Sequence, residues 1–445
     1  MATVEQAWLD ELSELLRIPS ISADPSHGAD VQAAAEWVAE KIRRGGGEGE
    51  ALDWNGHPLV VGELRASENA DSAPTVLCYG HFDVQPPAPL GLWTTDPFEP
   101  TIREEWLYAR GVADDKGQLW MLLEAASQLR AEGTLPVNVR FACDGEEETG
   151  GHSIVEFVEQ DERGADVAVI FDSGFLRRGV PIFNIAVRGM CYLHVTVRTG
   201  ERDLHSGMFG GAALNALEAL ARALQGIQAG PDGRLPQPLR EGMVGVTEAE
   251  LESWRALQPG SEVLEQAGAK PLDASAAAEF YLRTWAEPAT DVHGLEGGSP
   301  HLQKTVLPVL GEANVSMRLI AGQTPERMFP VLKRLLEAAA PPGAEVDVQL
   351  ISSSRGALIP PDSPAIRIGL DAFERALGVR PLLVRSGGSI PLVPALADKG
   401  IPTVLTGFDL PEGNIHSPNE RMLLGHFPLG VAAARQLFQG YGGLR

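Results

Sequence analysis

Apolar positions along the first part of the chain predict helices and buried strands in turn. The runs that begin at Val4 and Val31 place apolar residues three or four positions apart, which is the period of an amphipathic helix. Further on, short continuous apolar runs predict buried strands, with one helix among them. These strands and the helix are expected at 75–79, 118–129, 137–143 and 167–171. Strands that alternate with helices indicate an α/β fold with a mostly parallel sheet flanked by helices.

A different order of elements is predicted for the middle of the chain. It runs strand, helix, strand, strand, helix, strand, which is the order of an α+β ferredoxin-like domain. These elements are expected at 185–197, 211–227, 305–310, 313–319, 325–339 and 344–351. A segment rich in proline and glycine, from about 230 to 302, interrupts them. Because the first alternation resumes after 363, we expect the domain 185–355 to be inserted between two parts of a larger domain, 1–184 and 356–445.

Charge and cysteine content limit the kinds of partner. The 445 residues include 36 lysines and arginines against 60 acids, a net charge of −24, so nucleic acid and anionic membranes would be repelled. The 3 cysteines are widely spaced, which fits a reducing compartment better than a disulfide scaffold. Acids occupy the first residues where a signal peptide needs a basic segment, and no apolar run is long enough to span a bilayer. We therefore expect a cytoplasmic enzyme.

Chemically active side chains occur in five clusters. Three of them, 80–83, 144–150 and 169–174, lie at the carboxyl ends of predicted strands, where α/β sheets bind ligands. The cluster 111–117 is a loop that enters the predicted helix at 118, and 414–420 is a loop late in the chain. Each has a plainer explanation, since a lone histidine is more often a satisfied polar residue, paired aspartates can cap a helix, and an acidic run is usually solvated surface. Together, however, a histidine and several acids at the strand ends of one sheet indicate a carboxylate-rich site for two metal ions.

In their order and local sequence, these clusters resemble the motifs of the co-catalytic zinc metallopeptidases. That family includes carnosinases, cytosolic non-specific dipeptidases, aminoacylases and succinyl-diaminopimelate desuccinylases, and the similarity runs from Leu9 to Glu420. The dipeptidase branch is most similar, through segments 79–86, 203–211 and 292–298. Aminoacylase and desuccinylase relatives usually lack the long middle insertion. The resemblance therefore implies metal-dependent hydrolysis of dipeptides.

The resemblance also implies a metal ligand at each matching position. His81 and Asp172 would bind one divalent ion, and Glu148 and His416 would bind the other. Asp114 would bridge both ions, and the peptide bond after it would be cis. Zinc is the first choice of metal and manganese the second, because carboxylate-rich sites suit both.

Supporting roles are implied in the same way. Asp83 would steady His81, and Glu147 would be the general base. His205, from the inserted lid and dimerisation domain, would polarise the scissile carbonyl in the partner subunit of a homodimer. The residues that would hold the terminal carboxylate of the small peptide substrate are Arg318, Thr305, Ser386, Gly387, Gly388 and Ser389.

The charges of these residues support such a centre independently. Three ligand carboxylates and two divalent ions leave a net charge of about +1, so the centre stays electrophilic and a bound water has a pKa near 7. Glu147, which is not one of the metal ligands, can take the proton of that water and deliver it to the leaving amine. The planar fork of an arginine suits a carboxylate.

Departures from the family pattern leave alternatives open. The acidic cluster begins with Asp144 instead of the usual glutamate, and 352–356 lacks the glycine-flanked histidine of many dipeptidases. His205 could instead be an exposed cap, Arg318 a surface cation and Gly387-Gly388 a turn. One rival function is an N-acyl amino acid deacylase or desuccinylase with the same site. The other is a catalytically silent relative that binds metal or peptide.

Overall fold

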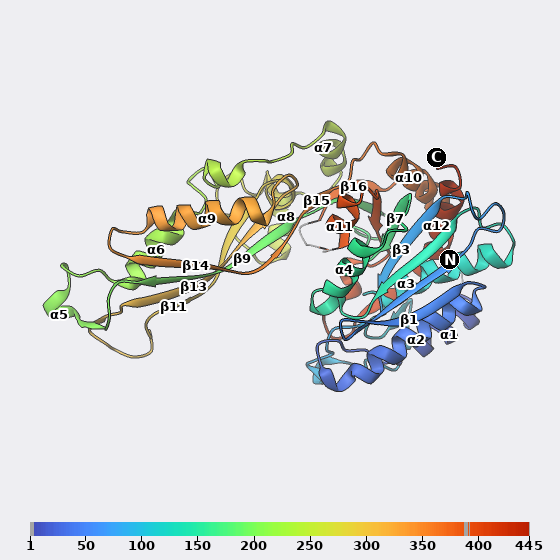
Figure 1. The fold of residues 1–445 in the computed structure, drawn as a ribbon, viewed down its shortest axis with the longest axis horizontal. Coiled ribbons are helices and arrows are strands. Elements are labelled where there is room, and N and C mark those ends of the chain that lie inside the picture. Colours follow the sequence, from blue (N-terminus) through green and yellow to red (C-terminus); the bar gives the residue numbers. More distant parts are fainter. Residues whose placement is uncertain (1–3, 387–389, 391, 445) are drawn as a thin grey trace. The chain divides into compact units, whose positions relative to one another are not determined.

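The protein is described by a computed structural model that covers residues 4–386, 390 and 392–444 (Figure 1). The chain divides into two compact units. The first contains the described residues of Met1–Ile185, Ile359–Val384 and Pro391–Arg445, and the second contains Ala186–Leu358 with Arg385, Ser386 and Ile390. Arg385 and Ser386 thus group with the second unit, although the sequence prediction placed them in the larger domain.

A sheet of nine strands, counted over the described residues, carries most of the predicted metal ligands at one edge. Its strand order is β1-β2-β6-β3-β7-β17-β8-β15, and β16 also pairs with β8. The strands are β1 (Glu48–Trp54), β2 (His57–Leu64), β3 (Thr75–His81), β6 (Asn138–Asp144), β7 (Val167–Phe171), β8 (Ile182–Val187), β15 (Ala357–Leu358), β16 (Leu382–Arg385) and β17 (Thr403–Thr406). The central strands β6, β3, β7 and β17 are parallel, whereas β2 and β8 pair with them in antiparallel fashion. The predicted mostly parallel sheet is confirmed.

Helices bury the central strands of this sheet. They are α1 (Gln6–Leu16), α2 (Gly28–Arg44), α3 (Lys116–Ala131), α4 (His152–Gln160), α10 (Pro364–Leu377), α11 (Leu392–Asp398) and α12 (His426–Tyr441). α12 packs against α3 and α10, and α11 packs against α4. Because β3, β6 and β7 lie in the middle of these layers, nearly all of their side chains are buried, which explains their continuous apolar runs. A separate small sheet has the order β18 (Arg421–Leu423), β5 (Trp106–Tyr108), β4 (Thr101–Arg103).

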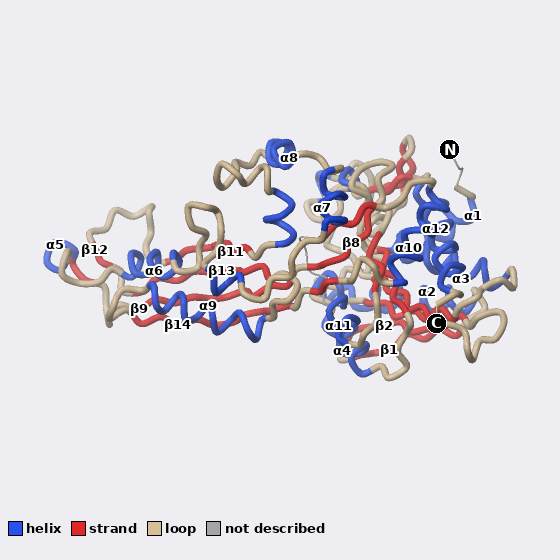
Figure 2. Tube along the Cα trace, turned by 90° about the horizontal axis from the view of Figure 1, so that it is seen from above, coloured by secondary structure: helices blue, strands red, loops and turns tan. Residues whose placement is uncertain are grey.

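The second unit is built on a four-stranded antiparallel sheet with the order β11-β13-β9-β14. Its strands are β9 (Gly189–Arg198), β11 (Ala289–Glu296), β13 (Leu310–Leu319) and β14 (Glu345–Ser354). Helices α6 (Ala216–Gln225) and α9 (Pro325–Ala339) run along these strands (Figure 2). Alternate residues of β9 are buried under the helices. Other elements of the unit are β10 (Leu204–His205), α5 (Ser206–Phe209), α7 (Glu248–Arg255), α8 (Gly260–Gln266) and β12 (Val306–Leu307).

The ferredoxin-like order of elements is present, but the prediction of its second strand was wrong. That strand is β11, whereas the segment predicted as a strand at 305–310 forms only the short β12, which pairs with β10. Most β11 side chains are exposed, so its sequence has no apolar run that would mark it as a strand. Pro308 interrupts the predicted segment because proline cannot donate to a strand ladder. Within the described ranges, no helix is long and apolar enough to cross a bilayer.

Candidate metal centre

The carboxyl ends of β3, β6 and β7 bring four sequence-predicted site residues to one edge of the sheet. His81 is the last residue of β3, and Asp172 directly follows β7. Glu147 and Glu148 lie in a short 3₁₀ helix just after β6. Since these strands are parallel and adjacent, their carboxyl ends meet at the same edge.

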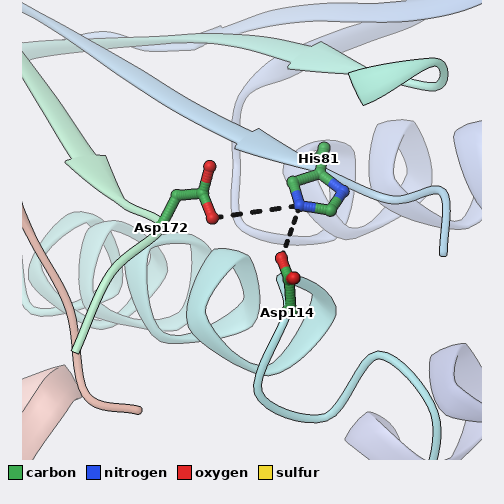
Figure 3. A group of neighbouring side chains, drawn as sticks. All are labelled: His81, Asp114 and Asp172. Carbon is green, nitrogen blue, oxygen red and sulfur yellow. Dashed lines mark hydrogen bonds and ion pairs between the residues drawn. The ribbon is translucent and has the colours of Figure 1, made fainter. Parts of the chain in front are cut away.

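Asp114 lies between the two predicted ligand histidines. Its Oδ1 is 2.9 Å from Nε2 of His81, which is also 4.0 Å from Oδ1 of Asp172 (Figure 3). Its Oδ2 is 2.9 Å from Nε2 of His416, and that nitrogen is 3.1 Å from Oε2 of Glu148. The peptide bond between Asp114 and Asp115 is cis, as the resemblance implied.

These five residues form two groups that could each hold a metal ion. One group is His81, Asp114 and Asp172, and the other is Asp114, Glu148 and His416. Within each group the ligand atoms lie within 4.8 Å of one another. Carboxylate oxygens and imidazole nitrogens suit zinc and manganese. The donor set therefore fits two divalent ions that share Asp114.

The electrostatics of the cluster favour a bound cation. Burial raises the pKa of Asp172 well above its usual value, and the neighbouring carboxylates of Asp114 and Glu147 raise it further, although His81 opposes them. In the described part of the chain, no lysine or arginine forms an ion pair with Asp114, Glu148 or Asp172. A divalent ion would relieve this repulsion between buried carboxylates.

His416 and Asp114 shift the pKa of each other in opposite directions. Hydrogen bonds with Asp114 and Glu148 raise the pKa of His416 to about 10. Burial acts to raise the pKa of Asp114, but hydrogen bonds with His416 and His81 outweigh it and hold that pKa below its usual range. A histidine must be neutral to bind a metal, so metal binding near neutral pH would release a proton from His416.

Asp83, which is fully buried, supports both the histidine and the acidic segment. Its Oδ1 lies 3.3 Å from Nδ1 of His81 and accepts the backbone N–H of Glu147 at 3.2 Å. Its Oδ2 accepts the N–H of Glu148 at 3.1 Å and the hydroxyl of Ser22 at 2.6 Å. A proton on Nδ1 of His81 would leave Nε2 free to bind a metal, which is the arrangement expected for a supporting carboxylate.

Glu147 is placed beside the predicted ligands without a partner of its own. Among the described residues, its carboxylate forms no hydrogen bond or ion pair. Burial raises its pKa, and the carboxylates of Glu148 and Asp114 add to the shift, although His81 opposes it. A carboxylate with a raised pKa and no fixed partner is suited to proton transfer near neutral pH.

The other predicted site residues that the structure describes belong to the second unit. His205 pairs with Val306 between β10 and β12, and the next residue, Ser206, donates its backbone N–H to the carbonyl of Thr305 at 3.0 Å. Arg318 is half-buried on β13, in a different sheet from His205. Ser386 donates its N–H to the carbonyl of Ala186 at 2.7 Å. Gly387, Gly388 and Ser389 lie outside the described residues.

Several residues that contact the cluster were not predicted from the sequence. Gln85 donates to Oε2 of Glu148 at 2.8 Å, Ser22 donates to Asp83, and Glu420 accepts the backbone N–H of Asp114 at 3.2 Å. Gln85 and Glu420 lie within segments that carry the family resemblance, so their positions in the sequence indicated that they lie near the site. Ser22 had no such indication, because nothing local in the sequence shows that the segment after α1 passes beside Asp83.

An α/β sheet with histidine and carboxylate side chains at its carboxyl edge is suited to a metal-dependent hydrolase. Residues 77–440 match Peptidase family M20/M25/M40. The chain belongs to this family, so the sequence resemblance is confirmed and the protein is a hydrolase of peptide bonds.

Relatives of known identity match nearly the whole chain. The cysteinylglycine-S-conjugate dipeptidase of Corynebacterium striatum is 30% identical over 431 residues, covering 92% of this chain and 90% of the relative. The Beta-Ala-His dipeptidase of Rattus norvegicus is 29% identical over 415 residues, covering 86% and 82%. Among solved structures, human carnosine dipeptidase 1 is 25% identical with a TM-score of 0.75, covering 98% and 96% of the two chains. The M20 family metallo-carboxypeptidase Sso-CP2 of Sulfolobus solfataricus is 25% identical with a TM-score of 0.83, covering 99% and 100%.

Proposed function

We propose that the protein is a dipeptidase that uses two divalent metal ions, zinc or manganese, with Glu147 as its general base. The observation that carries this proposal is the position of Asp114, which lies 2.9 Å from both His81 and His416 and belongs to both potential metal groups. The dipeptidase names of relatives that match most of the chain support the substrate class.

The proposed ligands divide into two sets with one member in common. His81 and Asp172 hold one ion, Glu148 and His416 hold the other, and Asp114 contributes to both. When bound, such ions polarise a peptide carbonyl and lower the pKa of water to about 7. The remaining chemistry belongs to side chains of the chain.

Glu147 moves the proton in this proposal. Its carboxylate takes a proton from the attacking water and delivers it to the nitrogen of the leaving amine. The raised pKa brings the carboxylate closer to neutral pH, at which such a transfer is most effective. Glu148 next to it is held by Gln85, so the two adjacent acids have different surroundings.

His205 donates a hydrogen bond to the carbonyl oxygen of the substrate. The backbone N–H of Gly207 donates to Nδ1 of His205 at 3.0 Å, which leaves Nε2 as the protonated, donating nitrogen. In the proposed homodimer, formed through the second unit, His205 of one subunit serves the site of the other. Asp83 keeps its supporting role beside His81.

The substrate's free carboxylate is bound by polar groups of the second unit. Arg318 provides the planar fork, and in this structure its guanidinium forms no hydrogen bond or ion pair with the residues described. The other proposed contacts are Thr305, Ser386, Gly387, Gly388 and Ser389. The protein is proposed to act in the cytoplasm, which its three buried, unpaired cysteines support.

A substrate panel with metal analysis tests the proposal. The purified protein, loaded with zinc or manganese, is given dipeptides, their N-acetylated and N-succinylated analogues, and tripeptides. We expect turnover of the free dipeptides, lost on chelation and restored by metal. Preference for acylated substrates would instead assign a deacylase or desuccinylase. Preference for tripeptides would favour a carboxypeptidase such as the Sulfolobus relative, and metal binding without any turnover would indicate a silent relative.

A further inference from the structure

Glu420 is a fully buried carboxylate that the proposed reaction does not use. It is the last residue before β18, which pairs with β5. The chain that leaves β5 continues directly into the loop that carries Asp114. Glu420 itself lies four positions after His416, at the end of the loop that carries this histidine. It therefore stands where two segments with proposed metal ligands meet.

Both oxygens of this carboxylate are saturated by donors from the Asp114 loop. Oε2 accepts hydrogen bonds from Nη1 of Arg110 at 2.6 Å and from the backbone N–H of Gly111 at 3.0 Å. Oε1 accepts the backbone N–H groups of Ala113 at 2.9 Å and Asp114 at 3.2 Å. A buried carboxylate with four donors is a strong local constraint, because charge-assisted hydrogen bonds are roughly twice as strong as neutral ones.

A second side chain fixes the same loop from another direction. Gln118, at the start of α3, donates to the carbonyl of Ala113 at 2.8 Å and accepts the backbone N–H of Phe408 at 2.7 Å. The peptide groups on either side of Ala113 are thereby held by Gln118 and Glu420. The Asp114 side chain extends from this fixed backbone toward His81 and His416.

We propose that Glu420 is a positioning residue of the metal centre, which ties the loop of Asp114 to the loop of His416 so that both ligands stay in reach of the same ion. This inference rests on the proposed function, since it concerns the proposed ligands. It adds a role for a residue that touches no metal and no substrate. Supporting groups of this kind are typically worth roughly 10- to 100-fold in metal affinity.

The substitution Glu420→Gln tests the inference with little change in shape. A glutamine has one accepting oxygen and one donating NH₂ group. In either orientation, the NH₂ group faces two of the four donors, so the loop has to move. We expect metal affinity, measured by chelator competition on the zinc- or manganese-loaded protein, to fall roughly 10- to 100-fold. Because Asp114 is common to both groups, both ions should weaken together.

A matched control separates positioning from general loss of an ion pair. Asp161→Asn removes the charge of a largely buried pair, in which Asp161 accepts a hydrogen bond from Nη2 of Arg140 at 2.8 Å. Asp161 precedes β7 and so lies toward the sheet edge opposite the ligands. We expect this variant to have a lower melting temperature than the wild type but the same metal affinity.

The outcomes distinguish this inference from the proposed function. If the wild type binds no metal, the proposed function fails first. If the wild type binds metal and the metal affinity of Glu420→Gln is within twofold of the wild-type affinity, Glu420 is not a positioning residue. Should Glu420→Gln not fold, Glu420→Asp keeps the charge for Arg110 but shortens the reach, and the same loss of affinity is expected. If neither variant folds with metal in excess, Glu420 is a general structural residue and the inference is overturned.

Discussion

Nε2 of His416 lies 2.9 Å from Oδ2 of Asp114, and the other oxygen of the same carboxylate lies 2.9 Å from Nε2 of His81. One aspartate therefore joins two histidines that are separated by most of the chain. Each histidine also has its own carboxylate, Asp172 or Glu148. The two halves of the site are thus similar in composition and depend on a single shared group.

This relationship predicts different metal contents for two aspartate variants. Asp114→Ala should lose both ions, since it removes the oxygen that Asp114 offers to each group. Asp172→Asn should lose the ion of the His81 group and keep the ion held by Glu148 and His416. Elemental analysis after dialysis against a weak chelator measures both contents. Equal contents in the two variants would contradict a shared ligand, provided that both melt cooperatively.

Glu147→Gln should separate metal binding from turnover. The carboxylate of Glu147 belongs to neither potential metal group, so the variant is expected to bind metal as the wild type does. A glutamine cannot accept and return a proton, and general acid–base catalysis is typically worth roughly 10²–10⁴-fold. We expect kcat for a dipeptide to fall by about that factor. Unchanged turnover with full metal content would exclude Glu147 as the base.

His205→Ala should lower the rate without removing metal. His205 belongs to the second unit and to neither metal group, and loss of an oxyanion donor costs roughly 10²–10³-fold in kcat. The stronger test mixes His205→Ala with Glu147→Gln under subunit exchange. If His205 serves the partner's site, mixed dimers contain one site with both residues intact, and part of the activity returns. Proven mixed dimers without recovery would restrict His205 to its own subunit.

Local patterning in the sequence marks the positions of several proposed metal ligands. His81 and Asp172 follow continuous apolar runs, which are typical of strands buried on both faces. In a parallel sheet, the ends of such strands have to meet at one edge. The grouping of these residues in space therefore follows from topology, although the distances between their atoms do not.

Other features left no local signal in the sequence. β11 is largely exposed, so its residues lack the alternation that marks a half-buried strand. Glu420 bonds to the backbone of Asp114 from 306 positions away, and its burial depends on the pairing of β18 with β5. The roles of His205 and Arg318 came from family resemblance alone, since neither position differs from an ordinary surface residue in its local pattern.

Asp144 predicts a specific dependence of stability on pH. Burial, together with the charge of Asp83, raises the pKa of Asp144 to about 8. Its Oδ1 accepts the N–H of Glu146 at 3.0 Å, while Oδ2 has no hydrogen-bond partner among the described residues. Because the folded state holds this proton more tightly than the unfolded chain, its contribution to stability is full below about pH 4 and is lost as the pH rises toward 8.

Asp144→Asn should therefore gain stability over the wild type as the pH rises. The asparagine oxygen can still accept the N–H of Glu146, but the side chain no longer ionises. Thermal melts at pH 5 and pH 9 should show a difference in Tm between variant and wild type that grows at pH 9, by on the order of a few degrees. A difference that is the same at both pH values would show that Asp144 does not titrate between them.

Whether Asp114 is shared by two metal ions can be measured by anomalous scattering from crystals of the metal-loaded protein, recorded at the absorption edge of the bound metal. We expect two peaks, one between Asp114, His81 and Asp172 and one between Asp114, Glu148 and His416. A single peak, or peaks that do not contact Asp114, would contradict this expectation.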